Sequence, residues 1–443
     1  MPQRPGNLRL CAVALAVACA PAALAACTGG GAVRHADVGR PATTSPSPVP
    51  IDGVAFASGD NGYGQLGTGD HEPQRSLRPV SGPFGASRLD GIVSVAAGLR
   101  HTIAVRADGS VVAWGANNDG QLGDGTRRPS PLPVRVRAPD GRPGWLTGAI
   151  AVAADSDFSM ALLRGGTVVT WGSADAGQRG IGATPPPLAP STVRAPRGNG
   201  PLRGARAIRA DGRSELALLA DGTVVGWGDN SFGQLGDGTY QLRNRPVFVH
   251  GLYGAPRLTG VRDIAMGGQH ALAVLVDGRV LSWGSNSRGQ LGDSSRGQRP
   301  FPDVVTGVDG DGVLDGVTSV CAAELSSMAL LGDGTAVGWG DDTAGQLGNG
   351  VRTSYQPAPT FVLPGERHEP LRGLRAIYCG EAYGYAVTSA GALLSWGAGS
   401  KGQLAAGPLV TRTRPGPVPL PRTGAVVSVG TGMRHVVVVL ATP

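Results

Sequence analysis

Residues 93–123 read VSVAAGLRHTIAVRADGSVVAWGANNDGQLG, and this stretch decides the fold. The apolar segments 101–105 and 111–114 flank the turn Asp108-Gly109. Such a pattern predicts a β-hairpin, because glycine adopts a positive φ at no steric cost. Gly-Gln-Leu-Gly begins at Gly120, six residues after Trp114. The stretch therefore predicts short strands joined by tight turns, and not helices.

The same pattern recurs along the chain, which is the mark of a repeat architecture. Gly-Gln-Leu-Gly or a close variant starts at Gly64, Gly120, Gly177, Gly233, Gly289, Gly345 and Gly402. Six copies carry the preceding tryptophan, namely Trp114, Trp171, Trp227, Trp283, Trp339 and Trp396. We interpret these tryptophans as structural residues that fill the wedge between neighbouring units. Ser58 takes the tryptophan position in the first copy, which predicts looser packing there.

The two ends of the repeat region complement each other. Residues 52–59 align with 108–115, and residues 426–440 align with 92–106, so each end supplies the part of a repeat that the other lacks. A closed ring requires such ends, because closure removes exposed sheet edges. We therefore predict an all-β fold over residues 51–443: a seven-bladed β-propeller with one blade closed jointly by the N- and C-terminal strands.

These motifs carry a family resemblance. Ala-Ala-Gly-Leu-Arg-His-Thr (96–102), followed by Asp-Gly, Trp-Gly, Asn and Gly-Gln-Leu-Gly, resembles the regulator-of-chromosome-condensation repeat. The resemblance covers almost all of the chain after residue 51. It implies a seven-bladed propeller with a shared closing blade, and a face that engages a protein. Arg179 in place of leucine and Ala405 in place of glycine depart from the repeat.

The N-terminal segment is typical of an export signal. Arg4 and Arg9 precede an apolar run, and Leu24-Ala25-Ala26-Cys27 resembles a bacterial lipobox. We predict a lipoprotein-type signal peptide over 1–26, a lipid anchor on Cys27 and a Ser/Thr/Pro-rich tether over 27–50. The protein would then sit on the outer face of the cell membrane and touch the membrane through lipid only. Cleavage after Ala23-Leu24-Ala25 is the alternative, and it would give a secreted protein.

Two cysteines remain after the signal and the anchor are set aside. Cys321 and Cys379 fall one residue apart in the register of adjacent repeats. A disulfide requires Cα atoms within about 7 Å. The spacing leaves both states open, and we expect two buried free thiols.

Charge and motifs argue against several functions. The net charge is +7, but the basic residues are scattered, whereas nucleic-acid binding usually requires a concentrated patch. The sequence contains no Gly-x-Ser-x-Gly or His-Glu-x-x-His motif. We expect no catalytic residues, no metal, no cofactor and no nucleic-acid partner, and we expect a monomer. Asp309, Asp311 and Asp315 suggest calcium weakly, and a solvated turn is the favoured interpretation.

One register holds the candidate contact residues. It lies just before His101, His270 and His435, which we interpret as structural histidines. Its residues vary while the framework repeats, which indicates a recognition surface; the alternative is a set of solvated loop residues. The predicted partner-binding set is Arg100, Asp157, Arg213, Gln269, Glu324, Glu381, Tyr383 and Arg434.

The sequence thus favours a non-enzymatic propeller that binds a protein, or a cell-wall glycan, through one face. One alternative is an inhibitor of a secreted enzyme such as a β-lactamase. A second alternative, by family analogy, is a guanine-nucleotide exchange factor, which the export signal disfavours.

Overall fold

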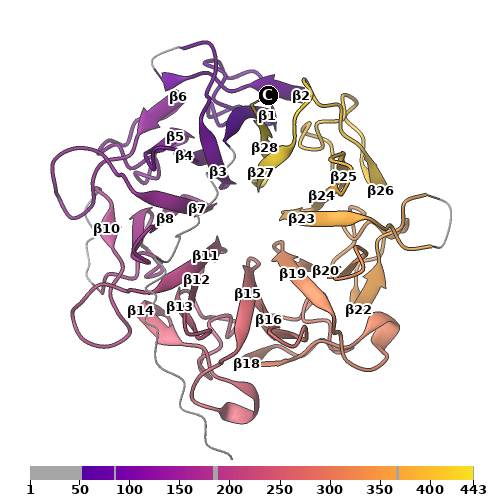
Figure 1. Cartoon of the computed structure of the whole chain (residues 1–443). Coiled ribbons are helices and arrows are strands. Elements are labelled where there is room, and N and C mark those ends of the chain that lie inside the picture. The colour runs from indigo at the N-terminus through magenta and orange to yellow at the C-terminus, as the bar shows by residue number, and fades with distance from the viewer. Residues whose placement is uncertain (1–51, 84–85, 183–187, 366–368, 443) are drawn as a thin grey trace, which may run out of the picture. The chain divides into compact units, whose positions relative to one another are not determined.

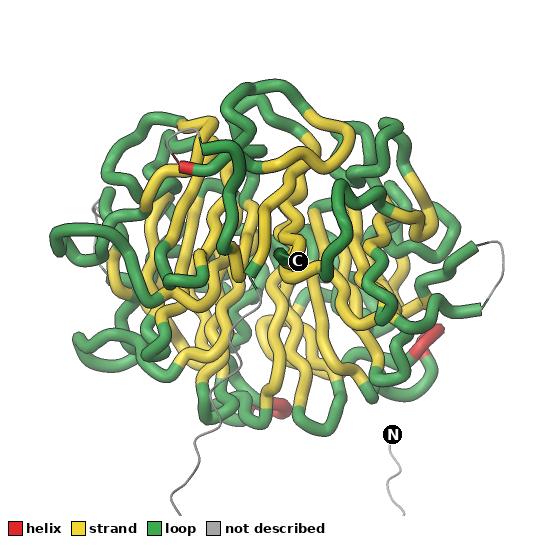
Figure 2. The backbone as a smooth tube through the Cα atoms, turned by 45° about the horizontal axis from the view of Figure 1, so that its top comes forward, coloured by secondary structure: helices red, strands yellow, loops and turns green. Residues whose placement is uncertain are grey.

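The computed structural model describes residues 52–83, 86–182, 188–365 and 369–442. The predicted signal peptide, the tether and Cys27 lie outside these residues. Antiparallel sheets stand in a ring around a central channel, and loops connect them on both sides of the ring (Figures 1 and 2). The expected all-β propeller is confirmed. Two short 3-10 helices, η2 (Leu252–Gly254) and η3 (Val308–Gly310), lie in outer loops.

Five sheets have four strands each, and in each sheet the strand that comes first in the sequence borders the channel. The first is made of β7 (Ala149–Asp155), β8 (Phe158–Leu163), β9 (Val168–Gly172) and β10 (Ser191–Thr192). The second is made of β11 (Ala205–Asp211), β12 (Ser214–Leu219), β13 (Val224–Gly228) and β14 (Arg243–Phe248). The third is made of β15 (Val261–Met266), β16 (His270–Leu275), β17 (Val280–Gly284) and β18 (Arg299–Val304). The fourth is made of β19 (Val317–Ala322), β20 (Ser326–Leu331), β21 (Ala336–Gly340) and β22 (Gln356–Phe361). The fifth is made of β23 (Leu374–Gly380), β24 (Tyr383–Thr388), β25 (Leu393–Gly397) and β26 (Arg412–Pro417).

The prediction of seven separate blades is wrong. Beside the five four-stranded blades, the described residues form one continuous eight-stranded sheet. Its strands are β1 (Gly53–Gly59), β2 (Gln74–Pro79), β3 (Ile92–Ala97), β4 (His101–Arg106), β5 (Val111–Gly115), β6 (Ser130–Arg135), β27 (Val426–Thr431) and β28 (His435–Ala441). The sheet is continuous because Gly53 of β1 pairs with Ile92 of β3. Counting repeats could not reveal this pairing, which depends on how closely two strands approach.

The two ends of the domain pair with each other inside that sheet. β1 runs antiparallel to β28 over seven residue pairs, from Gly53 opposite Ala441 to Gly59 opposite His435. All seven residues of β1 are buried. Pairing over this length satisfies the backbone groups of both terminal strands and leaves no free edge between them.

Each tryptophan of the repeat joins two units. All six are fully buried, and each indole Nε1 donates a hydrogen bond to a glutamine carbonyl of the preceding Gly-Gln-Leu-Gly segment. The pairs are Trp114 with Gln65, Trp171 with Gln121, Trp227 with Gln178, Trp283 with Gln234, Trp339 with Gln290 and Trp396 with Gln346, at 2.8–2.9 Å. The side chain therefore fills the wedge and also satisfies a buried carbonyl.

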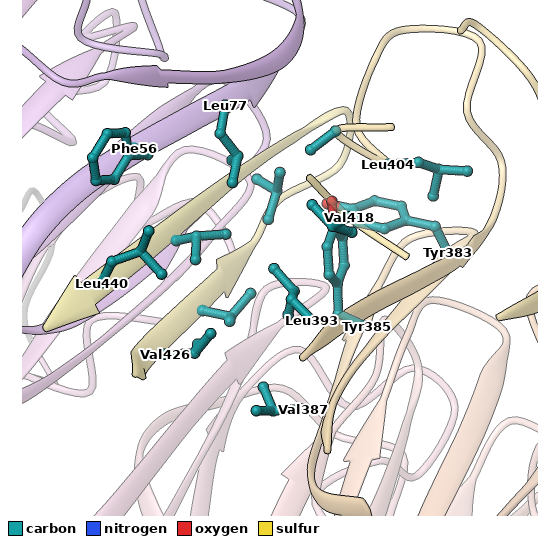
Figure 3. Close-up of a cluster of buried hydrophobic side chains, with 14 of the residues drawn as sticks. Phe56, Leu77, Tyr383, Tyr385, Val387, Leu393, Leu404, Val418, Val426 and Leu440 are labelled. Atoms are coloured by element: carbon teal, nitrogen blue, oxygen red, sulfur yellow. The ribbon is translucent and has the colours of Figure 1, made fainter. Parts of the chain in front are cut away.

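Tyr385 compensates for the missing tryptophan at Ser58. Its phenol Oη donates to the carbonyl of Gln403 at 2.8 Å, the carbonyl that a tryptophan at position 58 would otherwise reach. Tyr385 is fully buried in a cluster that spans the closure, where it lies beside Leu393 and Val418, and the cluster extends to Phe56 and Leu440 (Figure 3). The expectation of looser packing at Ser58 is therefore wrong, because an aromatic residue of the neighbouring blade occupies the space.

Three histidines connect neighbouring units through hydroxyl groups. His435, His101 and His270 are fully buried, and their Nε2 atoms contact Thr102 Oγ1 at 3.0 Å, Ser159 Oγ at 2.8 Å and Ser327 Oγ at 2.7 Å. Each hydroxyl donates onward to a glutamine carbonyl at 2.9 Å, so each histidine Nε2 carries the proton. Where the histidine is absent, the next unit has Glu215, Ala271, Gly384 or Val436 at the hydroxyl position. A histidine in one unit thus occurs together with a hydroxyl residue in the next unit, and this pairing can be found from the sequence alone.

Asp342 breaks the pattern of the signature loops. At its register, Asn117 accepts a hydrogen bond from Leu122 N and donates through Nδ2 to loop oxygens such as Arg128 O at 3.0 Å. Asp342 Oδ1 likewise accepts from Leu347 N at 3.0 Å, so a carboxyl oxygen takes the place of the amide nitrogen. Burial raises the pKa of Asp342 to about 7.

Asp342→Asn is expected to stabilise the protein above neutral pH. A carboxyl whose pKa is raised in the folded state stabilises below its unfolded pKa, and that contribution is lost as the pH rises through 7. We expect the free energy of unfolding at pH 8 to rise by on the order of 2 kcal/mol in the variant, with a smaller gain at pH 5. Urea unfolding at both pH values measures the gain, and an equal gain at both would contradict this account.

Candidate functional site

The inner hairpin loops gather at one mouth of the channel. These loops follow β3, β7, β11, β15, β19, β23 and β27, and their residues line a cavity of about 780 Å³. We call this end the acidic mouth, because six carboxyl residues line the cavity: Asp155, Asp211, Asp229, Asp263, Glu324 and Glu381. A cavity of this size falls in the range of ordinary ligand sites.

The structure places most of the predicted contact residues at this mouth. Arg213, Gln269, Glu324 and Glu381 line the cavity. Arg100 and Arg434 are exposed on the same loops, outside the lining, and Asp157 is partly exposed and accepts a hydrogen bond from Gln121 Nε2 at 2.6 Å. The set is therefore brought together on one face, with one exception.

The exception is Tyr383, which has no access to a partner. Its side chain is 2% exposed, and its Oη donates to the carbonyls of Gly432 at 2.7 Å and His435 at 2.8 Å. Tyr383 stands at the histidine register, where the side chain points to the neighbouring unit. It is therefore a structural residue and not a contact residue.

Glu324 and Glu381 form a carboxyl pair across two blades. Glu324 is exposed, Glu381 is partly exposed, and the two side chains share a hydrogen bond. Burial, followed by the charge of Glu324, raises the pKa of Glu381 to about 7, and Arg434 opposes this rise. Burial and the neighbouring carboxylate both favour the protonated form, so this pair retains a proton at higher pH than two separate glutamates would.

Asp155 and Asp211 form a second carboxyl pair, which the sequence reasoning missed. Burial raises the pKa of Asp211 well above its ordinary value, and Asp155, which shares a hydrogen bond with it, raises it further. Glu324 also raises the pKa of Asp211, so the two pairs lie within electrostatic reach of each other. A signal was present, because the other five repeats have only glycine or alanine at this register: Gly98, Gly267, Ala323, Gly380 and Gly432.

Three arginines near the mouth have partners of their own, whereas Arg434 acts on Glu381. Arg213 Nη1 lies 3.1 Å from Asp175 Oδ2, and Arg209 Nη2 lies 3.2 Å from Asp263 Oδ1. The Arg100 guanidinium lies over the Tyr63 ring at 4.7 Å. Much of the cation charge is therefore directed away from the carboxyl pairs, and the mouth keeps an acidic character although the whole chain has a net charge of +7.

Cys321 and Cys379 form a disulfide in the wall of the same cavity. The expectation of two free buried thiols is wrong. The sequence offset of one residue is absorbed because β19 and β23 lie side by side, with the two Cα atoms 5.6 Å apart. Both residues are partly exposed, so the bond faces the channel.

Residues 52–83, 86–182, 188–365 and 369–442 hold neither a cluster of metal ligands nor a membrane-spanning helix. No three His, Cys, Asp or Glu side chains there gather in a way that could hold a metal ion. Asp311 and Asp315 are exposed, as in a solvated turn. None of the helices within those ranges has the length and apolar character that a membrane span requires.

The chain matches curated proteins, and the share of each of those proteins that it covers differs widely. The chain is 31% identical over 348 residues to the human E3 ubiquitin-protein ligase HERC2, which is 77% of this chain but 7% of that protein. It is 30% identical over 372 residues to the ultraviolet-B receptor UVR8 of Arabidopsis thaliana, which is 82% of this chain and 78% of the receptor.

Solved structures share the fold. Human WBSCR16 superposes with a TM-score of 0.72 at 24% identity, covering 88% of this chain and 99% of that one. Prp20p from Saccharomyces cerevisiae superposes with a TM-score of 0.68 at 21% identity, covering 90% and 93%. The family model described as the RCC1-like domain matches residues 54–438. The resemblance read from the repeats is thus confirmed, and the chain belongs to the RCC1-like domain family.

Proposed function

We propose that this protein is a non-enzymatic binding module whose acidic mouth takes a basic segment of a protein partner. The observation that carries the proposal is the pairing of carboxyls at the rim of a cavity of about 780 Å³. In each pair the two carboxyl groups lie close together and the pKa of one of them is raised. An entering lysine or arginine would displace the retained proton and form an ion pair with the carboxylates.

The position of these carboxyls in the repeat supports a contact role. Asp155 and Asp211 replace small residues of the other repeats, and Glu324 and Glu381 stand where the loops vary. Framework residues repeat because each unit packs in the same way, whereas the identity of a contact residue depends on the partner that it binds. Variation at the mouth on a repeating framework therefore favours recognition over packing.

The binding partners named for relatives support a protein partner in general and do not identify it. Prp20p is described with binding properties to Gsp1p and histones, and a further structure shows Kap60 bound to yeast RCC1. Those statements belong to those proteins, which share the fold at 21% identity. The HERC2 match covers 7% of that ligase, so ligase activity is not carried over.

Affinity capture with matched variants tests the proposal. The full chain is immobilised and exposed to extracts and culture proteins, beside a mouth variant (Glu324→Gln with Glu381→Gln) and an outer-loop control (Asp311→Asn with Asp315→Asn). Both variants remove two carboxylates. A protein held by the parent and the control but lost from the mouth variant supports the proposal. A protein held equally by all three forms would move the site elsewhere, and capture of glycans alone would replace the protein partner.

We also propose that the protein is exported and held to the membrane by lipid on Cys27. The support is the lipobox-like Leu24-Ala25-Ala26-Cys27, in which the thiol stands where the lipid is attached. Cys27→Ser is expected to move the protein from the membrane fraction to the soluble fraction. Membrane retention of the variant after a salt wash would contradict the proposed lipid anchor on Cys27.

A further inference from the structure

The interface between the fourth and fifth four-stranded sheets lacks the histidine–hydroxyl connection that three other interfaces have. At this interface Ser326 stands at the histidine register, and Gly384 stands at the hydroxyl register of the next unit. Glycine has no side chain, so the bond that His270 makes to Ser327 at 2.7 Å has no counterpart here. A Cβ at position 384 would lie 2.7 Å from the Trp396 ring, which explains why no larger residue fits.

The disulfide connects the same two sheets. Cys321 belongs to β19 and Cys379 to β23, the channel-lining strands of those blades, and the two strands belong to different sheets. Glu324 follows Cys321 by three residues, and Glu381 follows Cys379 by two. The covalent bond therefore ties together the two loops that carry the carboxyl pair of the acidic mouth.

A reductant can reach this bond from the channel. Both cysteines are partly exposed and line the cavity of about 780 Å³. Thiol–disulfide exchange requires that a thiolate approach a sulfur atom, and a buried bond would not allow it. The position of the disulfide in the channel wall thus exposes it to a reductant and connects it to the acidic mouth.

We propose that the Cys321–Cys379 disulfide is a redox switch for the acidic mouth. A dithiol reductant attacks one sulfur, the S–S bond breaks, and a mixed disulfide forms. The second thiol of the reductant then displaces the protein thiol. Two electrons and two protons pass to the protein, which ends with two thiols, and the reductant ends as a cyclic disulfide.

Reduction releases the two loops from each other. The apolar packing of the two sheets and the hydrogen bond shared by Glu324 and Glu381 then remain as the contacts between the loops. Once the pair loses its proton, the two carboxylates repel each other and move apart, because the covalent bond no longer holds the loops. The mouth loses the preorganised pair that binds a basic side chain, and its affinity falls. This inference rests on the proposed function for its effect on binding, but not for the opening of the carboxyl pair.

The test uses the full chain in its oxidised form, the same chain treated with dithiothreitol, and the double variant Cys321→Ser with Cys379→Ser. A peptide of three arginines is the probe, and titration calorimetry measures its Kd. We expect reduction to weaken binding about tenfold, the cost of reordering one or two side chains. The double variant should bind the peptide with the same Kd as the reduced chain, and dithiothreitol should not change that Kd. This comparison controls for thiols elsewhere in the chain. Equal Kd values for the oxidised and reduced chains would overturn the proposal.

Two readouts do not depend on peptide binding. Alkylation and mass analysis of the folded protein must show Cys321 and Cys379 becoming reactive under dithiothreitol, and resistance of the bond would overturn the switch. Carboxyl NMR of labelled glutamates must show the apparent pKa of Glu381 falling on reduction, and an unchanged pKa would also overturn it. If the oxidised chain ignores the peptide while both readouts change, the proposed function fails and the switch stands. Cys321→Ala with Cys379→Ala serves if the serine variant does not fold.

Discussion

Replacing Tyr385 by alanine is expected to lower the free energy of unfolding by about 4 kcal/mol, and replacing it by phenylalanine by about 1–2 kcal/mol. Alanine leaves a cavity in the cluster that joins both chain ends, and it removes the hydrogen bond to the Gln403 carbonyl. Phenylalanine keeps the ring and removes only the donor, so the difference between the variants separates packing from hydrogen bonding. Urea unfolding monitored by fluorescence measures both.

The matched control is Tyr63→Phe. Tyr63 lies at the rim, where its ring faces Arg100 and its hydroxyl donates no hydrogen bond to the described residues. We expect a change below about 0.5 kcal/mol there. A Tyr385→Phe variant as stable as the parent would show that the closure does not depend on this tyrosine replacing the indole donor.

Acid is expected to destabilise the ring through its buried histidines. Burial lowers the pKa of His101 and His270 to about 3 and that of His435 to about 4, with His435 further lowering that of His101. The unfolded chain binds protons near pH 6.5 and the folded chain does not, so stability falls as the pH drops below 6.5. Each histidine costs about 2 kcal/mol of stability at pH 5 relative to pH 7.

Variants isolate this effect from carboxyls that act in the opposite direction. The pKa values of Glu381 and Asp342 are raised to about 7, so these groups stabilise the fold as the pH falls. His270→Gln is therefore compared with Ser327→Ala at the same interface, which keeps the histidine. Between pH 7 and 5 the glutamine variant should lose about 2 kcal/mol less than the parent, and the alanine variant should lose as much as the parent. Parallel pH profiles for all three proteins would refute the assignment.

The sequence predicted the repeating framework because each repeat solves the same packing problem. Trp114 and its five equivalents, the Asp-Gly turns and the complementary ends all follow from local chemistry repeated at a fixed spacing. The number of separate sheets did not follow, since one residue pair between Gly53 and Ile92 merges two neighbours. Such a contact depends on how strands approach, which no period in the sequence encodes.

The candidate site could be predicted in part. The loop register found Glu324 and Glu381, because variation on a repeating framework marks a surface. Tyr383 was placed in that surface wrongly, since its phenol reaches carbonyls of the next blade, and this requires knowledge of the direction of the side chain. Asp155 and Asp211 were missed because each stands two residues before the compared loop register, which holds Asp157 and Arg213. The state of Cys321 and Cys379 was predicted wrongly as two free thiols, since a one-residue offset does not determine whether two strands meet.

The most direct test of the central claim is the pH dependence of basic-peptide binding to the full oxidised chain. Titration calorimetry with the three-arginine peptide at pH 6 and pH 8 compares the parent, the mouth variant Glu324→Gln with Glu381→Gln, and the outer-loop control Asp311→Asn with Asp315→Asn. The parent and the control should bind more tightly at pH 8, because Glu381 loses its proton near pH 7. The mouth variant should bind about tenfold more weakly than the parent at pH 8. It should also show a smaller pH dependence than the parent, because it lacks Glu381 but keeps the Asp155–Asp211 pair. Binding by the mouth variant that equals the parent at both pH values would contradict the account and move recognition away from the acidic mouth.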